Sequence, residues 1–204
     1  MVAALHPVSL DRRLVEVTLA LLADEGLGAL SLRRIARRAG VSHGAPLRHF
    51  HGLADLLSAV AARGFALLSE AIEKSGAQLP PGAGPVARLR AAGRAYVETA
   101  IANPDLFALM FRPGDLDLTH PDYQRESSAA FEQVVRHVRA AQDAGWQTGR
   151  DTRLLAGCVW SGVHGLATLW AQGAFTGPIP GASLEDALST TLELVLDTKQ
   201  GDDR

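Results

Sequence analysis

The densest group of binding side chains in this 204-residue chain lies between Leu32 and Gly52. The stretch reads LRRIARRAGVSHGAPLRHFHG and holds five arginines and three histidines, with no aspartate or glutamate. Guanidinium groups carry a permanent charge and bind phosphate oxygens through paired hydrogen bonds. The chain as a whole has a net charge of −2, which excludes a general polyanion binder. The stretch therefore predicts a local phosphate-binding surface.

Apolar residues around this stretch recur at helical spacing and predict three helices before residue 52. The first spans residues 10–25. Ser31 is a suitable N-cap for the second helix, and Gly40 supplies the left-handed backbone that ends it. Ser42 is expected to cap a third, shorter helical segment. The four-residue AGVS connection between the second and third segments matches a helix-turn-helix.

A helix-turn-helix reads DNA with its second helical segment, so exposed side chains around the turn are candidates for DNA contact. Ile35 and Ala36 face inward on the preceding helix and leave its arginines outside. Arg48 and His49 are expected to touch phosphate. The residues expected nearest to base edges are His43, Gly44 and Ala45. The complete predicted DNA-binding set is Ser31, Arg33, Arg34, Arg37, Ser42, His43, Gly44, Ala45, Arg48 and His49.

Composition and cysteine content favour a cytoplasmic protein without metal or cofactor. Cys158 has no partner for an internal disulfide and reads as a small buried side chain in a reducing compartment. His49 and His51 are two residues apart, a spacing that points them to different sides of a helix and disfavours a metal pair. No signal peptide and no uninterrupted apolar stretch long enough to cross a membrane are found.

The remainder of the chain also reads as helices, so we predict an all-α fold. The segment GAQLPPGAGP (76–85) marks a linker, and further helices are expected up to residue 198. No period-2 pattern typical of strands is found. The predicted division is a helix-turn-helix DNA-binding domain in residues 1–51 and a larger helical regulatory domain in residues 52–204.

The basic stretch resembles a known family of regulators. SLRRIARRAGVSHGAPLRHF, followed by LADLLSAV, is similar to the DNA-binding domain of the TetR family of bacterial transcriptional regulators. Chain length and the helical pattern agree, so the resemblance covers essentially the whole chain. It implies a DNA-binding head and a body that binds ligand and forms a dimer. Such proteins usually bind palindromic operators as homodimers and dissociate when a small molecule binds.

The C-terminal part resembles one branch of this family. The motif VWSGVHGLATLW (159–170), with NPDLFALMF upstream, is similar to the Trp-His-Gly type of C-terminal domain. The family commonly packs its last two helices against their twins, here residues 151–173 and 183–198. The stripe expected in that four-helix interface is Leu184, Leu188, Leu192 and Val195.

Two positions depart from the family pattern within the DNA-binding head. Leu47 stands where a tyrosine is usual, and Leu53 stands where a lysine is usual. In relatives, the tyrosine and the lysine at these two positions commonly contact phosphate. Their replacement is expected to weaken DNA binding and to flatten its dependence on salt.

Trp160 and His164 are four residues apart and share a helix face. With other aromatic side chains they predict an apolar ligand cavity with a few polar groups, although a packed core with a satisfied histidine remains an alternative. No basic residue is apparent on that face, so an apolar, neutral effector is expected. The predicted ligand-binding set is Tyr96, Phe107, Met110, Phe111, Trp160 and His164.

Three functions are consistent with these patterns. The favoured one is a ligand-responsive regulator, a repressor that binds operator DNA as a homodimer. An enzyme built on His164, Asp117 and His120 is disfavoured, because no nucleophile elbow, carboxylate pair or phosphate-binding glycine loop is present. The third is a dimeric helical interaction protein whose DNA binding is weakened or lost, as Leu47 and Leu53 suggest.

Overall fold

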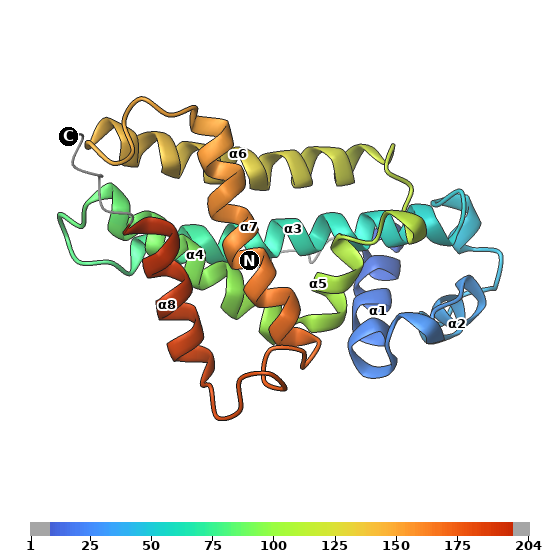
Figure 1. The fold of residues 1–204 in the computed structure, drawn as a ribbon. Coiled ribbons are helices and arrows are strands. Elements are labelled where there is room, and N and C mark those ends of the chain that lie inside the picture. The colour runs from blue at the N-terminus through green and yellow to red at the C-terminus, as the bar shows by residue number, and fades with distance from the viewer. Residues whose placement is uncertain (1–8, 198–204) are drawn as a thin grey trace, which may run out of the picture. The chain divides into compact units, whose positions relative to one another are not determined.

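The computed structural model describes residues 9–197, and every regular element in that range is helical (Figure 1). This confirms the predicted all-α fold. The α-helices are α1 (Leu10–Glu25), α2 (Leu32–Arg38), α3 (Leu53–Ala77), α4 (Pro85–Ala102), α5 (Pro104–Met110), α6 (Pro121–Asp143), α7 (Thr152–Ala171) and α8 (Leu184–Leu196). The short 3-10 turns are η1 (Leu27–Ala29), η2 (Pro46–Arg48) and η3 (Pro113–Asp115).

The described chain forms two compact units. The first contains residues 9–64 together with Asp105–Glu126, and the second contains Phe65–Pro104 together with residues 127–197. Helix α3 therefore begins in the first unit and continues into the second. These units are defined by contacts within the chain. The predicted boundary at residue 52 between a DNA-binding and a regulatory domain is defined by function and remains a prediction.

The ends of α2 show why the sequence forms a short helix at this point. The Ser31 hydroxyl oxygen accepts a hydrogen bond from the Arg34 amide at 3.3 Å, which confirms the predicted N-cap. At the other end Gly40 has a φ of +67°. The Val41 amide donates to the carbonyl of Ala36 at 3.0 Å and the Gly40 amide donates to Arg37 at 3.1 Å. This is a Schellman motif, and it sets the direction in which the chain leaves α2.

In the second unit α4 packs against both α7 and α8. Gly93 permits this close packing, because a Cβ atom there would lie 2.7 Å from Cδ2 of Leu192 and 3.4 Å from Cγ1 of Val163. Helices α7 and α8 are capped by Asp151 and Ser183, whose side chains accept from the amides three residues later. Gly93 thus allows α4 to approach α7 and α8 closely in the core of this unit.

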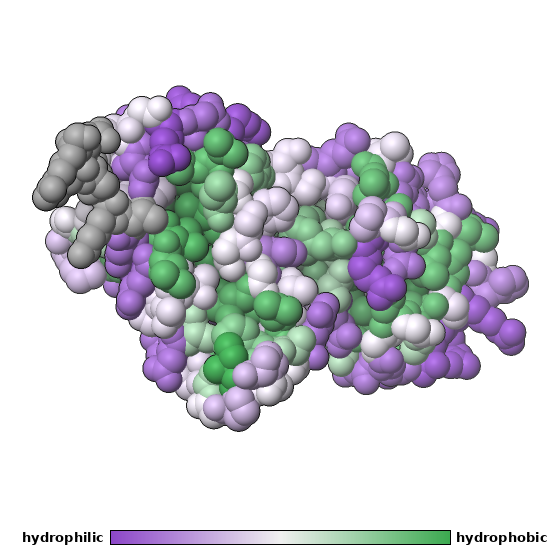
Figure 2. All heavy atoms as spheres, in the orientation of Figure 1, coloured by the Kyte–Doolittle hydropathy of each residue, from purple (hydrophilic) through white to green (hydrophobic). Residues whose placement is uncertain are grey.

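Helix α7 is long and apolar enough to cross a membrane by length and composition alone. One such helix is weak grounds for a membrane span, because apolar helices of other proteins pass the same test. Of its apolar window, 28% is buried within the chain. Leu154 is 66% exposed on α7 and Leu194 is 73% exposed on α8. Apolar surface is visible over these two helices in Figure 2.

The predicted interface stripe on α8 is wrong for two of its four residues. Leu188 and Leu192 are each 1% exposed and belong to the core of their own unit. The leucine spacing is helical, but periodicity alone does not tell which neighbour covers a helix face. Helix α8 ends at Leu196, and residue 198 of the predicted helix lies outside the described residues.

Candidate DNA interface and effector cavity

The turn after α2 differs from the helix that the sequence predicts. An α-helix opening at Ser42 needs an amide at position 46 to bond the Ser42 carbonyl, and Pro46 has none. The Ser42 carbonyl instead accepts from the Ala45 amide at 3.0 Å. A turn over residues 43–45 therefore leads into the short 3-10 turn η2.

Two buried side chains hold this turn in place. Pro46 and Phe50 are buried, and the Phe50 amide donates to the Pro46 carbonyl at 2.9 Å. The His49 amide donates to the same carbonyl at 3.0 Å. With these anchors inside, Arg48 and His49 are left exposed, as a DNA-contacting segment requires.

The predicted DNA-binding residues all lie in the first unit, and most are at its surface. Gly44 and Ala45 are half-buried. The exposed members of the predicted set are Ser31, Arg33, Arg37, Ser42, His43, Arg48 and His49. These exposed residues lie on and around α2 and η2.

Two arginines of this region face the protein's own carboxylates. Arg34, which is half-buried, forms an ion pair with Glu25, and Arg38 lies 3.8 Å from Asp24. Among the described residues Arg33, Arg37 and Arg48 form no ion pair. Ion pairs with large exposed surface contribute little free energy, so phosphate can compete with these carboxylates. In the free protein these carboxylates reduce the positive charge that the sequence alone indicates for this surface.

The two departures from the family pattern have different surroundings. Leu47 is 58% exposed on η2, between the buried Pro46 and the exposed Arg48. Leu53 is the first residue of α3 and is half-buried. Neither side chain has a hydrogen-bond donor for a phosphate oxygen.

The loop before α6 is tied to the beginning of α3 inside the first unit. The Asp55 carboxylate accepts from the His51 amide at 2.8 Å, and Nε2 of His120 lies 3.6 Å from its other oxygen. Nδ1 of His120 accepts from the Asp122 amide at 3.2 Å, which places the proton of a neutral ring on Nε2, facing Asp55. His120 thus acts as a structural connection and as the cap of α6.

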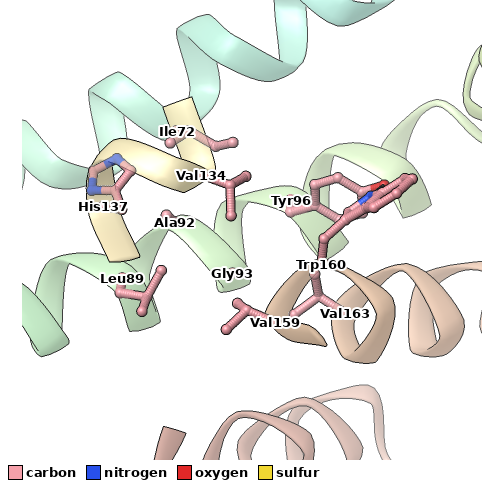
Figure 3. A pocket seen from close by; sticks show the side chains of 10 residues that line it. All are labelled: Ile72, Leu89, Ala92, Gly93, Tyr96, Val134, His137, Val159, Trp160 and Val163. Carbon is pink, nitrogen blue, oxygen red and sulfur yellow. Dashed lines mark hydrogen bonds between the residues drawn. The ribbon is translucent and has the colours of Figure 1, made fainter. Parts of the chain in front are cut away.

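The second unit contains a small apolar cavity between four helices. Its volume is about 20 Å³, room for roughly one water molecule. Figure 3 shows side chains from α3, α4, α6 and α7 around it. The lining residues are Ile72, Leu89, Ala92, Gly93, Tyr96, Val134, His137, Val159, Trp160 and Val163.

Tyr96 connects the cavity to the Trp-His motif of α7. Its hydroxyl lies 2.8 Å from Nδ1 of His164 and accepts from Nε1 of Trp160 at 3.1 Å. Because the indole can only donate, the tyrosine proton is directed to His164, and the neutral imidazole then carries its proton on Nε2. Burial raises the pKa of Tyr96 and lowers the pKa of His164, so both groups are neutral at pH 7.

The structure divides the predicted ligand-binding residues into two groups. Tyr96, Trp160 and His164 lie together in the second unit. Phe107, Met110 and Phe111 belong to the first unit and do not line the cavity. There the rings of Phe107 and Phe111 meet edge to face at 5.2 Å, and a Cβ atom added to Gly64 would lie 2.6 Å from Sδ of Met110.

His137 is the polar cavity residue that sequence reasoning missed. It lies on α6 directly before the fully buried Val138, so its own half-burial is not apparent from the pattern. Ile72, Leu89 and Val134 were missed as well, because apolar residues on adjoining helix faces look alike whether they line a cavity or fill a core. The sequence feature that could have identified His137 as a cavity residue is its position directly beside the apolar residues of α6.

Family comparisons match both the N-terminal helix-turn-helix region and the C-terminal helical region of the chain. Residues 14–60 match the family described as "Bacterial regulatory proteins, tetR family". Residues 89–195 match the family described as "Tetracyclin repressor-like, C-terminal domain". No functionally curated protein is similar enough to this chain to count as a match.

Solved structures resemble the chain over nearly its whole length. A Rhodococcus sp. RHA1 protein, described as of unknown function, is 32% identical over 95% of this chain and 97% of its own, with a TM-score of 0.78. A fatty acid degradation regulator from Bacillus halodurans is 15% identical over 91% and 94%, with a TM-score of 0.69. A TetR family transcription regulator from Marinobacter aquaeolei VT8 is 18% identical over 91% and 94%, with a TM-score of 0.63. The last two show similarity of fold.

The matched families consist of transcription factors, which agrees with the prediction that the chain is not an enzyme. Of the residues considered for an enzyme, Asp117 and His120 lie in the first unit and His164 lies in the second. The helix-turn-helix, the helical C-terminal domain and the two family matches lead to one conclusion. The chain belongs to the TetR family of bacterial regulatory proteins.

Proposed function

We propose that this chain is a repressor that binds palindromic operator DNA as a homodimer and is released by a small, largely apolar effector. The observation that carries the proposal is the exposed cationic surface of α2 and η2. Arg33, Arg37 and Arg48 are exposed there, and no carboxylate of the described residues pairs with them. Such guanidiniums are suited to the phosphates on either side of a major groove.

The exposed apolar faces of α7 and α8 support dimer formation. On α7 the exposed residues Leu154, Cys158 and Ser161 follow one another at three- to four-residue spacing, and the exposed Leu169 lies two turns further along. Cys158 is thus exposed and not buried as expected from the sequence. On α8 Leu194 is exposed in the same unit. A second copy of the chain would bury these leucines. This keeps the predicted interface on the last two helices but changes the residues that form it.

The cavity in the second unit supports effector binding. Its surface is apolar, and the polar atoms of Tyr96 and Trp160 are hydrogen-bonded to each other at one end (Figure 3). A volume of about 20 Å³ is too small for an organic effector, so an effector must displace side chains to bind. In the DNA-bound dimer the DNA-binding surfaces of the two subunits must lie one DNA turn (~34 Å) apart to reach both half-sites. We propose that displacement of the cavity side chains by the effector changes this separation and releases the DNA. The Trp-His motif on α7 further supports a place in the Trp-His-Gly branch of the family.

The test begins with the purified full-length chain and a randomised duplex library, followed by footprinting on the DNA upstream of its coding region. The expected result is a protected palindrome with half-sites roughly 10 base pairs apart, centre to centre. Small apolar compounds that raise the melting temperature should then release the protein from this DNA. A chain that selects no sequence and protects no palindrome contradicts the proposal.

The second candidate function is a dimeric interaction protein with weakened or lost DNA binding. Leu47 and Leu53 favour it, because neither can donate a hydrogen bond to phosphate. The ion pair between Arg34 and Glu25 removes a further cation. A dimer in solution that fails to select DNA would support this candidate.

A further inference from the structure

A buried amide on α6 carries a hydrogen-bond acceptor that the described chain does not use. The Gln133 residue is 4% exposed, and its Nε2 donates to the Ser69 carbonyl on α3 at 3.3 Å. Its Oε1 atom is buried and accepts no hydrogen bond from any described residue. Exchanging the two amide atoms would turn Oε1 toward the Ser69 carbonyl and oppose two acceptors, so the bond to Ser69 fixes the orientation. A buried oxygen without a donor destabilises the free protein.

Gln133 lies beside the cavity of the second unit, outside its present lining. On α6 the cavity is lined by Val134, the next residue, and by His137, one turn after Gln133. On α3 it is lined by Ile72, one turn after Ser69. Figure 3 shows Ile72 and Val134 reaching into the cavity from these two helices. The bond between Gln133 and Ser69 therefore lies one helical turn before the wall that α3 and α6 form.

The unused acceptor favours one direction in which the cavity can open. An organic effector needs more than the roughly 20 Å³ present, so side chains of the wall must move. Most of the wall is aliphatic, and separating aliphatic side chains loses packing without giving any polar group a partner. Opening along α3 and α6 brings the ligand to Oε1 of Gln133. Because this oxygen has no donor in the free protein, a ligand that donates to it displaces no protein hydrogen bond there.

We infer that the effector is an uncharged, largely apolar molecule with a hydrogen-bond donor, of the alcohol type, and that Oε1 of Gln133 accepts its hydrogen bond. This inference rests on the proposed effector function and names the chemistry of its ligand. An ionised carboxylate has acceptors alone and would oppose the amide oxygen with a second negative oxygen. The apolar lining offers it no opposite charge. Gln133 thus selects donors and rejects anions.

The experiment compares straight-chain alcohols with their isomeric methyl ethers, such as octan-1-ol with 1-methoxyheptane. The two members of a pair have the same atoms, but the ether cannot donate a hydrogen bond. Binding to the full-length protein at pH 7 is measured by titration calorimetry for pairs with six, eight and ten carbons. The alcohol of the tightest pair should bind about 10-fold more tightly than its ether. An apolar cavity without an acceptor would favour the ether, because the alcohol would lose its hydrogen bond to water.

Gln133→Met keeps the length of the side chain and removes the amide. It should weaken binding of the alcohol about 10-fold and leave binding of the ether unchanged. Gln133→Leu is a second variant with the same expected result. Gln172→Met is the matched control, since it makes the same chemical change at an exposed residue at the end of α7. The control should keep the preference for the alcohol.

Three results overturn the inference. The first is equal affinity, or tighter binding of the ether, in every pair with the unchanged protein. The second is no binding of any probe. The third is a preference for the alcohol that survives substitution of Gln133. The proposed function fails separately, if the protein selects no DNA or no compound releases it.

Discussion

The Tyr96 hydroxyl lies 2.8 Å from Nδ1 of His164, although the two residues are 68 positions apart in the chain. The contact joins α4 to α7, and the Trp160 indole donates to the same hydroxyl at 3.1 Å. The ring of Phe131 on α6 meets Trp160 edge to face at 6.1 Å. One phenolic oxygen thus orients both polar residues of the α7 motif, and the surrounding rings hold it in position.

Tyr96→Phe removes this oxygen while keeping the ring. We expect a loss of about 1–2 kcal/mol in the free energy of unfolding, because Trp160 and His164 lose their shared partner inside the unit. Denaturant unfolding followed by tryptophan fluorescence measures it. Tyr123→Phe is the control, since its hydroxyl makes a longer 3.3 Å bond to the Met110 carbonyl in the first unit. Equal losses in the two variants would contradict a special role for Tyr96.

Stability should fall as the pH is lowered below about 6.5, the pKa of histidine in an unfolded chain. Burial lowers the pKa values of His164 and His137 in the folded protein, so the unfolded state binds more protons in this range. The fall levels off below the folded-state pKa values. The free energy of unfolding is measured at pH 7.5 and pH 5.5, a range in which the histidines take up protons. The pKa of Glu185 is lowered in the folded protein, so its contribution to stability is lost only at more acidic pH. The double variant His137→Gln with His164→Gln should make the free energy of unfolding nearly independent of pH in this range. An unchanged pH dependence would show that these two histidines are not its origin.

Gly93→Ala should destabilise the second unit by about 1–3 kcal/mol, the usual cost of overpacking. The new methyl group would lie 2.7 Å from Cδ2 of Leu192, a core residue with little room to move. Gly76→Ala in α3 is the matched control, since the nearest atom to its Cβ is a guanidinium nitrogen 4.0 Å away. That substitution should stabilise by roughly 0.5–1 kcal/mol through helix propensity. Thermal unfolding of both variants checks the opposite signs.

Leu154→Glu and Leu194→Glu should each convert a dimer to monomers, because a charge would be buried in the proposed interface. Sedimentation velocity measures the change. Leu118→Glu serves as the control, since Leu118 is 45% exposed in the first unit. A dimer that survives both α7 and α8 substitutions would place the interface elsewhere.

Leu47→Tyr with Leu53→Lys should tighten operator binding and steepen its salt dependence, because each side chain adds a phosphate contact in both subunits. Arg37→Ala should do the reverse and lower the slope of log K against log salt by roughly 1 per subunit. Fluorescence anisotropy over a salt series measures both. The exposed position of Leu47 makes it available for such a contact. Parallel salt titrations for all three proteins would show that Arg37 on α2, position 47 on η2 and position 53 on α3 do not meet the DNA backbone.

Local signals in the sequence were sufficient for the helices and for the turn after α2. Ser31 and Gly40 act within a few residues of themselves, so their capping roles could be read without tertiary information. Pro46 shows the limit of this reasoning. Ser42 predicts a third helical segment, but the missing amide of Pro46 shortens this segment to a 3-10 turn.

The sequence by itself determined the all-helical fold, the basic helix-turn-helix and the pairing of Trp160 with His164 on one helix face, because these depend on spacing along a single segment. Tertiary structure decided which faces are covered: it buried Leu188 and Leu192, exposed Leu154, and brought His137 to the cavity. It also neutralised Arg34 with a carboxylate from α1. These outcomes depend on neighbours distant in the chain, and an apolar or charged pattern does not say which neighbour it will meet.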